Sequence, residues 1–273
     1  MNSIPQITDR EALERNRTRA QSNPATFLHE EAIAEVQDRL SLVNREFTNI
    51  AIVTGHPSVW SKAFPTSTVV PDAETLSLEP NSKDLVIHAM SLHWANDPIG
   101  QIIQCRRALR PDGLFLAVAF GGDTLTELRE ALSRAEIETK GGLSPRVAPM
   151  AELRDMGSLL QRAGLALPVA DSLPLNVEYR DIYHLMHDLK AMGEANALAE
   201  RHRAFVGKSL FASAQSHYSR LNPTESGRIP ATYELIFLLG WAPDESQQKP
   251  LRPGSASASL AQALGTTENP LKD

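Results

Sequence analysis

The residues best suited to chemistry follow short apolar runs of the sequence. Residues 84–88 read Asp-Leu-Val-Ile-His, which is typical of a buried strand, and His93 and Trp94 come soon afterwards. Ligands of open α/β sheets bind at the carboxyl ends of the strands, so both side chains could face a ligand. A histidine there can act as a general base or orient a substrate near neutral pH, and Trp94 can form a pocket wall. The alternative is that both side chains pack against the helix that follows.

Three other residues stand where a ligand could meet the same edge. Gly55 ends the first apolar run and would let a ligand approach the backbone, although a simple strand-to-turn role is the alternative. Asp72 could accept a hydrogen bond from a ligand, or it could be the turn residue after Pro71. Asp123 could contact a substrate or cap the next helix. His93 and Asp123 are therefore the candidate catalytic residues, without an assigned step.

The sequence offers no motif for a metal or an activated nucleophile. His184 and His187 are three residues apart on a predicted helix, but no third ligand can be identified, so we predict no metal site. The single cysteine, Cys105, excludes a disulfide framework and a multi-cysteine zinc or iron–sulfur site. We expect it to be a small buried residue. Neither the G-x-S-x-G pattern nor a phosphate-binding P-loop is present.

The composition excludes several other classes of protein. Hydrophobic residues make up 42% of the 273 residues, which is enough for a sizeable core. With 27 basic and 33 acidic side chains the net charge is −6, so we expect no nucleic-acid surface. No apolar stretch approaches the ~18 residues that a membrane span requires. Residues 1–10 lack the apolar core of a secretion signal. These features predict a cytoplasmic protein.

Apolar runs alternate with helical patterns, which predicts βα units on a largely parallel sheet. The predicted strands are residues 50–53, 69–70, 84–88, 114–120 and 232–239, with an extended stretch at 167–179. The predicted helices are residues 99–109, 125–138, 151–163, 182–192 and 195–218. We divide the chain into a helical N-terminal segment (1–45), a main domain (46–243) with a helical insertion (about 182–220), and an irregular tail (244–273).

The N-terminal helical segment carries a group of arginines. They are Arg10, Arg15, Arg17 and Arg19. These side chains could form a docking patch for an acidic partner, but we favour the interpretation that they line a solvated helix face.

Longer motifs give the chain a resemblance to known proteins over about residues 45–265. The first group is Asp72-Ala73-Glu74, Asp84-Leu85-Val86, Leu92-His93-Trp94, Arg106 to Gly113 and Gly121 to Leu125. This order resembles the class I S-adenosylmethionine (SAM) dependent methyltransferases. The second group is Ser144 to Pro149, Leu159 to Leu165, Met192 to Leu198 and Gly240 to Pro243. It resembles the branch of the methyltransferase-like arginine hydroxylase of respiratory complex I assembly, and the chain is also similar to malonyl-acyl-carrier-protein methyltransferase.

The resemblance implies a fold and a cofactor site. The fold would be a class I methyltransferase-like (Rossmann-like) α/β sheet with a helical N-terminal cap and an inserted helical lid. The cofactor would be SAM, and the residues implied to bind it are Gly55, Asp72, Ala73, His93 and Trp94. In such a site the Asp72 carboxylate would accept a hydrogen bond from the adenine amino group, and the Ala73 backbone N–H would meet a ring nitrogen.

The turn after the first strand departs from the family pattern. The family has a G-x-G-x-G turn there, because glycines let the backbone approach the ligand. Residues 54–60 of this chain contain one glycine, Gly55. His56 and Trp60 carry side chains where close approach needs none, and Pro57 removes a backbone donor. The sequence therefore predicts a degenerate SAM-binding motif.

The spacing of the acidic residues also departs from the family. Asp72 lies 17 residues after Gly55, and Asp84 follows after only 12 more. A further strand and crossover between them would need at least ~10–12 residues for the crossover alone. One βα unit is therefore predicted to be missing, and Asp72 cannot serve as both the ribose acid and the adenine-side acid.

The resemblance leaves three functions open. The first is SAM-dependent methyl transfer. The second is hydroxylation of an arginine on a complex I subunit, with the guanidinium received by Asp123, Glu127, Glu194 or Glu74. The third is a non-catalytic assembly or binding module with a decayed SAM pocket. All three fit a protein partner, a respiratory complex I subunit by resemblance, and a cytoplasmic location that could be peripheral at the inner membrane. A nicotinamide oxidoreductase is disfavoured because the remaining glycines are absent.

Overall fold

The computed structural model describes residues 6–204, 206–248 and 265. The chain divides into two compact units, residues 1–243 and residues 244–273. The predicted tail at 244–273 lies mostly outside the described residues, and the domain boundaries stay predictions. In the first unit a mixed six-stranded sheet forms the centre.

The sheet has the strand order β2-β1-β3-β4-β6-β5. Its strands are β1 (Ile50–Thr54), β2 (Thr68–Val70), β3 (Lys83–Ala89), β4 (Leu109–Phe120), β5 (Ala166–Tyr179) and β6 (Ile229–Trp241). The first four strands are parallel, whereas β6 runs antiparallel to both β4 and β5. The predicted strands and the predicted α/β class are confirmed. Between β1 and β3 the structure has one helix and one short strand, while the loss of a βα unit relative to the family stays a prediction.

The central strands β1, β3 and β4 are buried on both faces, and the side chains that alternate along them pack against helices on either side of the sheet. On one face Ile52, Ile87 and Leu116 pack with residues of α2 (Phe27–Ser41) and α3 (Pro57–Ala63). On the other face Val53 and Phe115 pack with α4 (Pro98–Ala108) and α6 (Leu153–Arg162). Near-continuous apolar runs in the sequence follow from this two-sided burial.

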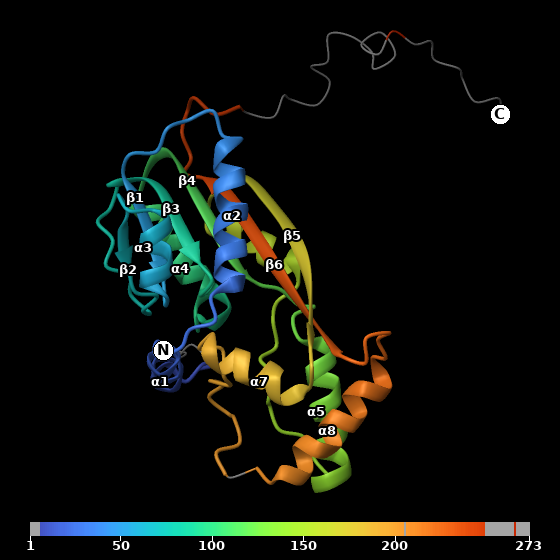
Figure 1. The fold of residues 1–273 in the computed structure, drawn as a ribbon. Coiled ribbons are helices and arrows are strands. Elements are labelled where there is room, and N and C mark those ends of the chain that lie inside the picture. Colours follow the sequence, from blue (N-terminus) through green and yellow to red (C-terminus); the bar gives the residue numbers. More distant parts are fainter. Residues whose placement is uncertain (1–5, 205, 249–264, 266–273) are drawn as a thin grey trace, which may run out of the picture. The chain divides into compact units, whose positions relative to one another are not determined.

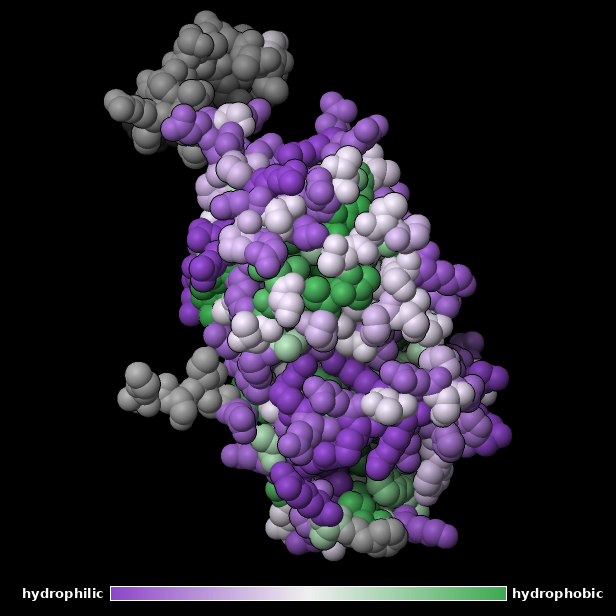
Figure 2. Space-filling model, turned by 90° about the vertical axis from the view of Figure 1, so that its left-hand side faces the viewer, coloured by the Kyte–Doolittle hydropathy of each residue, from purple (hydrophilic) through white to green (hydrophobic). Residues whose placement is uncertain are grey.

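The remaining helices gather beyond the carboxyl ends of the parallel strands (Figure 1). They are α1 (Arg10–Ala20), α5 (Thr126–Lys140), α7 (Ile182–Ala191) and α8 (Lys208–Leu221). α7 and α8 lie between β5 and β6 in the chain, as the predicted helical insertion requires. None of the helices in the described ranges is long and apolar enough to cross a membrane. Figure 2 shows a mostly hydrophilic face with small hydrophobic patches.

The predicted helix at 195–218 is wrong in its first half. The helix there begins at Lys208. The preceding segment instead pairs with the N-terminal segment, where Asp9 donates its backbone N–H to the Ala197 carbonyl at 2.8 Å and Ala199 donates to the Ile7 carbonyl at 2.8 Å. Backbone groups used in this way are not available for a helix.

Candidate functional site

Residues from three strand ends meet at the carboxyl edge of the sheet, as the sequence predicts. Gly55 follows β1, Asp72 follows β2, and His93 and Trp94 lie in a short 3-10 helix after β3. The N-terminal helix α1 adds Arg17, which the sequence reasoning named in an arginine group but did not place at this edge. Parallel neighbouring strands end at one edge, and this is the physical reason that these distant residues come together.

Asp72 is a buried ion-pair partner of α1. Arg17 Nη1 lies 2.8 Å from Asp72 Oδ1 and 3.0 Å from Oδ2, and Arg10 Nη1 lies 3.2 Å from Oδ2. Arg10 also donates to the Asp72 carbonyl at 2.6 Å. Burial raises the pKa of Asp72, but the Arg17 and Arg10 guanidinium groups outweigh that effect and lower it. Both carboxylate oxygens are thus engaged by the protein itself.

The guanidinium of Arg17 also covers Gly55. A Cβ added at Gly55 would lie 2.1 Å from Arg17 Cζ, so the guanidinium occupies the space that the missing side chain leaves open. Arg17 is only 6% exposed, and its Nε and Nη2 are buried without a hydrogen-bond partner. The interpretation of Arg17 as part of a solvated helix face is therefore wrong. It faces inward because Asp72 supplies a buried counter-charge.

In this arrangement Arg17 occupies the two surfaces at which a SAM-like cofactor is predicted to bind. The two features predicted to meet it, the Asp72 carboxylate and the Gly55 backbone, are both covered by Arg17. Ala73 is exposed, and its carbonyl accepts a hydrogen bond from Gln101 Nε2 at 3.1 Å. Gln101 Oε1 in turn lies 2.6 Å from the Nε2 of buried His88, which fixes the loop after β2.

The side chains of the degenerate turn fill the adjoining space. Trp60 is fully buried and donates Nε1–H to His29 Nδ1 at 3.1 Å, and the His29 and His56 rings lie 4.4 Å apart. Burial lowers the pKa of His29 to about 3, and burial also lowers the pKa of His56. Both histidines are therefore neutral near pH 7. His56 and Trp60 fill space where the family pattern has glycines, and His29 of α2 packs against both of them.

Acidification should destabilise the protein through His29. The folded-state pKa of about 3 lies below the ordinary value of 6.5, so the unfolded chain binds more protons between these limits and the stability falls as the pH falls from 6.5. One such group contributes up to ~1.4 kcal/mol per pH unit. His29→Asn removes the titrating group but retains an acceptor for Trp60. The free energy of unfolding, measured by urea unfolding between pH 6.5 and 5, should therefore depend less steeply on pH in this variant. His187→Asn, an exposed control on α7, should keep the wild-type slope, and equal slopes in all three proteins would contradict this account.

His93 and Trp94 share one acidic partner, Glu194, which follows α7. Trp94 donates Nε1–H to Glu194 Oε2 at 2.6 Å, and His93 Nε2 lies 3.4 Å from the same oxygen. The Phe120 backbone N–H is directed at His93 Nδ1 at 3.4 Å, so Nε2 is the nitrogen that donates to Glu194. Burial raises the pKa of Glu194, but the His93 hydrogen bond and the nearby charges outweigh it and lower it to about 2. Glu194 is therefore a buried, ionised carboxylate.

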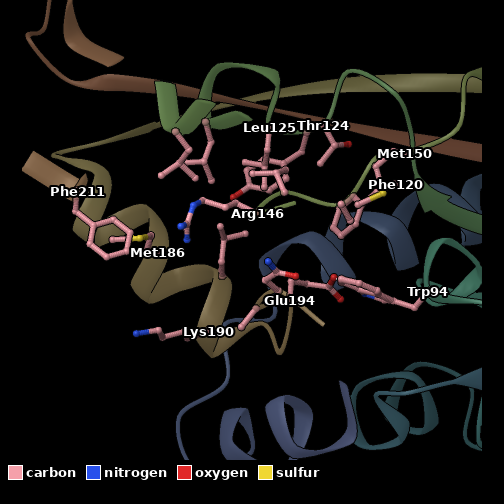
Figure 3. Close-up of a pocket in the computed structure, with 18 residues that line it drawn as sticks. Trp94, Phe120, Thr124, Leu125, Arg146, Met150, Met186, Lys190, Glu194 and Phe211 are labelled. Carbon is pink, nitrogen blue, oxygen red and sulfur yellow. The ribbon is translucent and has the colours of Figure 1, made fainter. Parts of the chain in front are cut away.

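An apolar cavity of about 220 Å³ opens beside this carboxylate. Leu128, Met186 and Phe211 are among its lining residues and come from α5, α7 and α8. Figure 3 shows Glu194 and Trp94 on one side of the cavity, and Phe211 and Met186 on the other. Within the described part of the chain, no group donates a hydrogen bond to Glu194 Oε1. The cavity thus combines a largely apolar wall, which also includes Arg146 and Lys190, with one carboxylate that still has acceptor capacity.

The other candidate acids lie elsewhere. Asp123 is exposed and does not cap α5, which begins at Thr126. The two residues between them are held to β6, because Leu125 N donates to the Thr232 carbonyl and Thr124 Oγ1 donates to the Glu234 carbonyl. Glu127 accepts hydrogen bonds from Thr232. Glu74 accepts from Asn96. Of the four acids considered from sequence, only Glu194 lines the cavity. The motif around Glu194 could suggest it as a candidate, but the sequence could not predict that its side chain is buried.

His184 and Cys105 lie outside this region, and their contacts give each of them a structural role. His184 Nδ1 lies 2.9 Å from the Asp181 carboxylate that begins α7. In the ranges that the structure describes, no group of three His, Cys, Asp or Glu residues could hold a metal ion. Cys105 is buried on α4, and burial raises the pKa of its thiol.

Comparisons with known proteins agree with the predicted resemblance. A family model described as a methyltransferase domain matches residues 33–117. "Arginine-hydroxylase NDUFAF5, mitochondrial" of Dictyostelium discoideum is 42% identical over 209 residues, 76% of this chain and 48% of the relative. The human protein of that name is 40% identical over 206 residues, 76% of this chain and 59% of the relative. "Malonyl-[acyl-carrier protein] O-methyltransferase" of Laribacter hongkongensis is 36% identical over 186 residues, 68% of this chain and 60% of the relative.

This chain is therefore similar to a methyltransferase domain and, over about three quarters of its own length, to the proteins named arginine-hydroxylase NDUFAF5. It spans about half to three-fifths of the length of these curated relatives.

Proposed function

We propose that this protein binds a protein partner through an arginine side chain of that partner, received in the cavity beside Glu194. The observation that carries the proposal is the buried, ionised Glu194 carboxylate at one side of a largely apolar cavity. Two cationic residues, Arg146 and Lys190, also line this cavity, and Arg146 is paired with Glu136 at 2.6 Å. A buried charge without a full set of partners is costly, so such a carboxylate favours a cationic ligand.

An arginine side chain matches both features of the cavity. Its aliphatic stem can lie along apolar residues such as Leu128, while its guanidinium donates charge-assisted hydrogen bonds to a carboxylate. The rings of Trp94 and Phe120 line the same cavity, and guanidinium groups stack on aromatic faces. The related proteins carry the name arginine-hydroxylase, which supports arginine as the group that is received.

The partner that the resemblance supports is a subunit of respiratory complex I. On this proposal the protein acts on that subunit or assists its assembly, and it acts where the complex resides, at the inner membrane. The net charge of −6 is compatible with a partner that presents a basic side chain.

SAM is the cofactor proposed for the carboxyl edge of the sheet, on the basis of the family match. Gly55, Asp72, Ala73, His93 and Trp94 remain its proposed contacts. A second candidate function, a non-catalytic assembly module, is favoured by one observation, because Arg17 covers both Asp72 and Gly55. Arginine recognition at Glu194 is common to both functions, and no catalytic step is assigned.

Titration with paired peptides tests the arginine proposal. A short synthetic peptide with one arginine is compared by calorimetry with the same peptide carrying citrulline, which keeps the shape but loses the charge. Charge-assisted hydrogen bonds contribute about 1.5–3 kcal/mol, so we expect at least ~10-fold tighter binding of the arginine peptide. In Glu194→Gln the preference should vanish. Equal binding of both peptides by the wild-type protein, or an unchanged preference in Glu194→Gln, would refute the proposal.

A further inference from the structure

α1 carries the side chain that blocks the predicted cofactor edge. Arg17 pairs with both oxygens of Asp72 at 2.8 and 3.0 Å, and its guanidinium lies against Gly55. These contacts come from a segment that precedes the sheet in the chain, so α1 can be displaced without unfolding a strand.

The blocked arrangement leaves Arg17 poorly satisfied. The side chain is only 7% exposed, and its Nε and Nη2 are buried without a hydrogen-bond partner. Buried donors that lose water without gaining a partner oppose folding. An element held in this way is easier to displace than one whose polar groups are all paired.

α1 packs against the loop that also carries Glu194. A Cβ at Gly193 would lie 3.1 Å from Arg17 Cγ and 3.2 Å from Arg17 Cα, so this glycine lets α1 approach closely. Asn16 Nδ2 donates to the Ala195 carbonyl at 2.9 Å on the other side of Glu194. Movement of α1 would therefore change the surroundings of both the cofactor edge and the arginine cavity.

We propose that α1 is a built-in strap, which must move so that Arg17 leaves Asp72 and Gly55 before an adenosyl ligand can bind at the carboxyl edge. This proposal rests on the proposed SAM site. The ligand would take over the two surfaces that Arg17 now covers, and its adenine amino group would replace the guanidinium as a donor to Asp72. Any ligand that binds there must offset the loss of the Arg17–Asp72 ion pair, so the strap weakens binding.

The test uses S-adenosylhomocysteine as the probe in calorimetric titrations of the full chain. Arg17→Met removes the blocking charge but leaves Arg10 paired with Asp72, so the buried carboxylate keeps one partner. Arg15→Met is the matched control, because Arg15 lies on the same helix with a side chain that is 54% exposed. We expect Arg17→Met to bind the probe at least ~10-fold more tightly than the wild type. Arg15→Met should bind like the wild type.

Hydrogen exchange gives a second measurement that does not depend on a variant. At saturating S-adenosylhomocysteine, the backbone amides of residues 10–20 in the wild-type protein should exchange faster than in the free protein. Wild-type binding with unchanged α1 exchange, or weaker binding by Arg17→Met, would overturn the strap and leave the SAM proposal standing. An absence of binding by every protein at millimolar probe would refute the SAM site, and the strap with it.

Discussion

Asp72→Asn is expected to lower the free energy of unfolding by about 3–5 kcal/mol, since the substitution breaks a buried ion pair and leaves an uncompensated charge. Arg17 is 6% exposed, and Asp72 is the acceptor that its guanidinium uses. Arg10 loses the same partner. A change of this size exceeds that of most single substitutions and should be plain in urea unfolding curves.

Two further variants decide whether the ion pair is the cause. Arg17→Met combined with Asp72→Asn removes the buried positive charge as well, and it should recover part of the lost stability. Glu130→Gln breaks the exposed pair with Arg134, whose two side chains are each 50% exposed, and it should change stability by about 0–1 kcal/mol. A loss below about 1 kcal/mol in Asp72→Asn would show that the pair does not hold α1 in place.

Ala148→Trp should weaken binding of the arginine peptide at least ~10-fold, because a large ring would fill the cavity that receives the side chain. Ala148 lines the cavity and is only half-buried, so the new side chain has room to fold without disrupting the core. Ala151→Trp, at an exposed position three residues further on, is the matched control and should bind normally. Equal affinity of the two variants would place the peptide outside the cavity.

The central strands of the sheet could be predicted from sequence because they are buried on both faces. Runs such as residues 50–53 and 114–120 therefore contain almost only apolar residues. His93 and Trp94 could be selected by the same logic, since they follow a strand whose end must lie at the ligand edge. The degenerate turn was also visible, and the structure shows why His56 and Trp60 are there, because they pack with His29.

The role of Arg17 could not be derived from composition, because an arginine-rich helix usually faces solvent. One signal was present in the spacing: Arg10, Leu13, Arg17 and Ala20 share one helix face, and Leu13 and Ala20 are buried. The burial of Glu194 depends on contacts with Trp94 and His93, a hundred residues away, which no local pattern encodes. The first half of the predicted helix at 195–218 is wrong because pairing with residues 7–9 overrides local helix propensity.

The central claim, that the Glu194 carboxylate receives an arginine side chain, is tested most directly by the indole N–H signals of the tryptophans. The chain has three tryptophans, and the Trp94 Nε1–H donates to Glu194 Oε2 at 2.6 Å, whereas the Trp60 Nε1–H donates to His29. Trp94→Phe assigns the signal in a nitrogen–proton correlation spectrum. Saturation with the arginine peptide should shift the Trp94 signal and leave the Trp60 signal in place, and the citrulline peptide should shift neither. A Trp94 signal that stays in place, or that moves equally with both peptides, would contradict the claim.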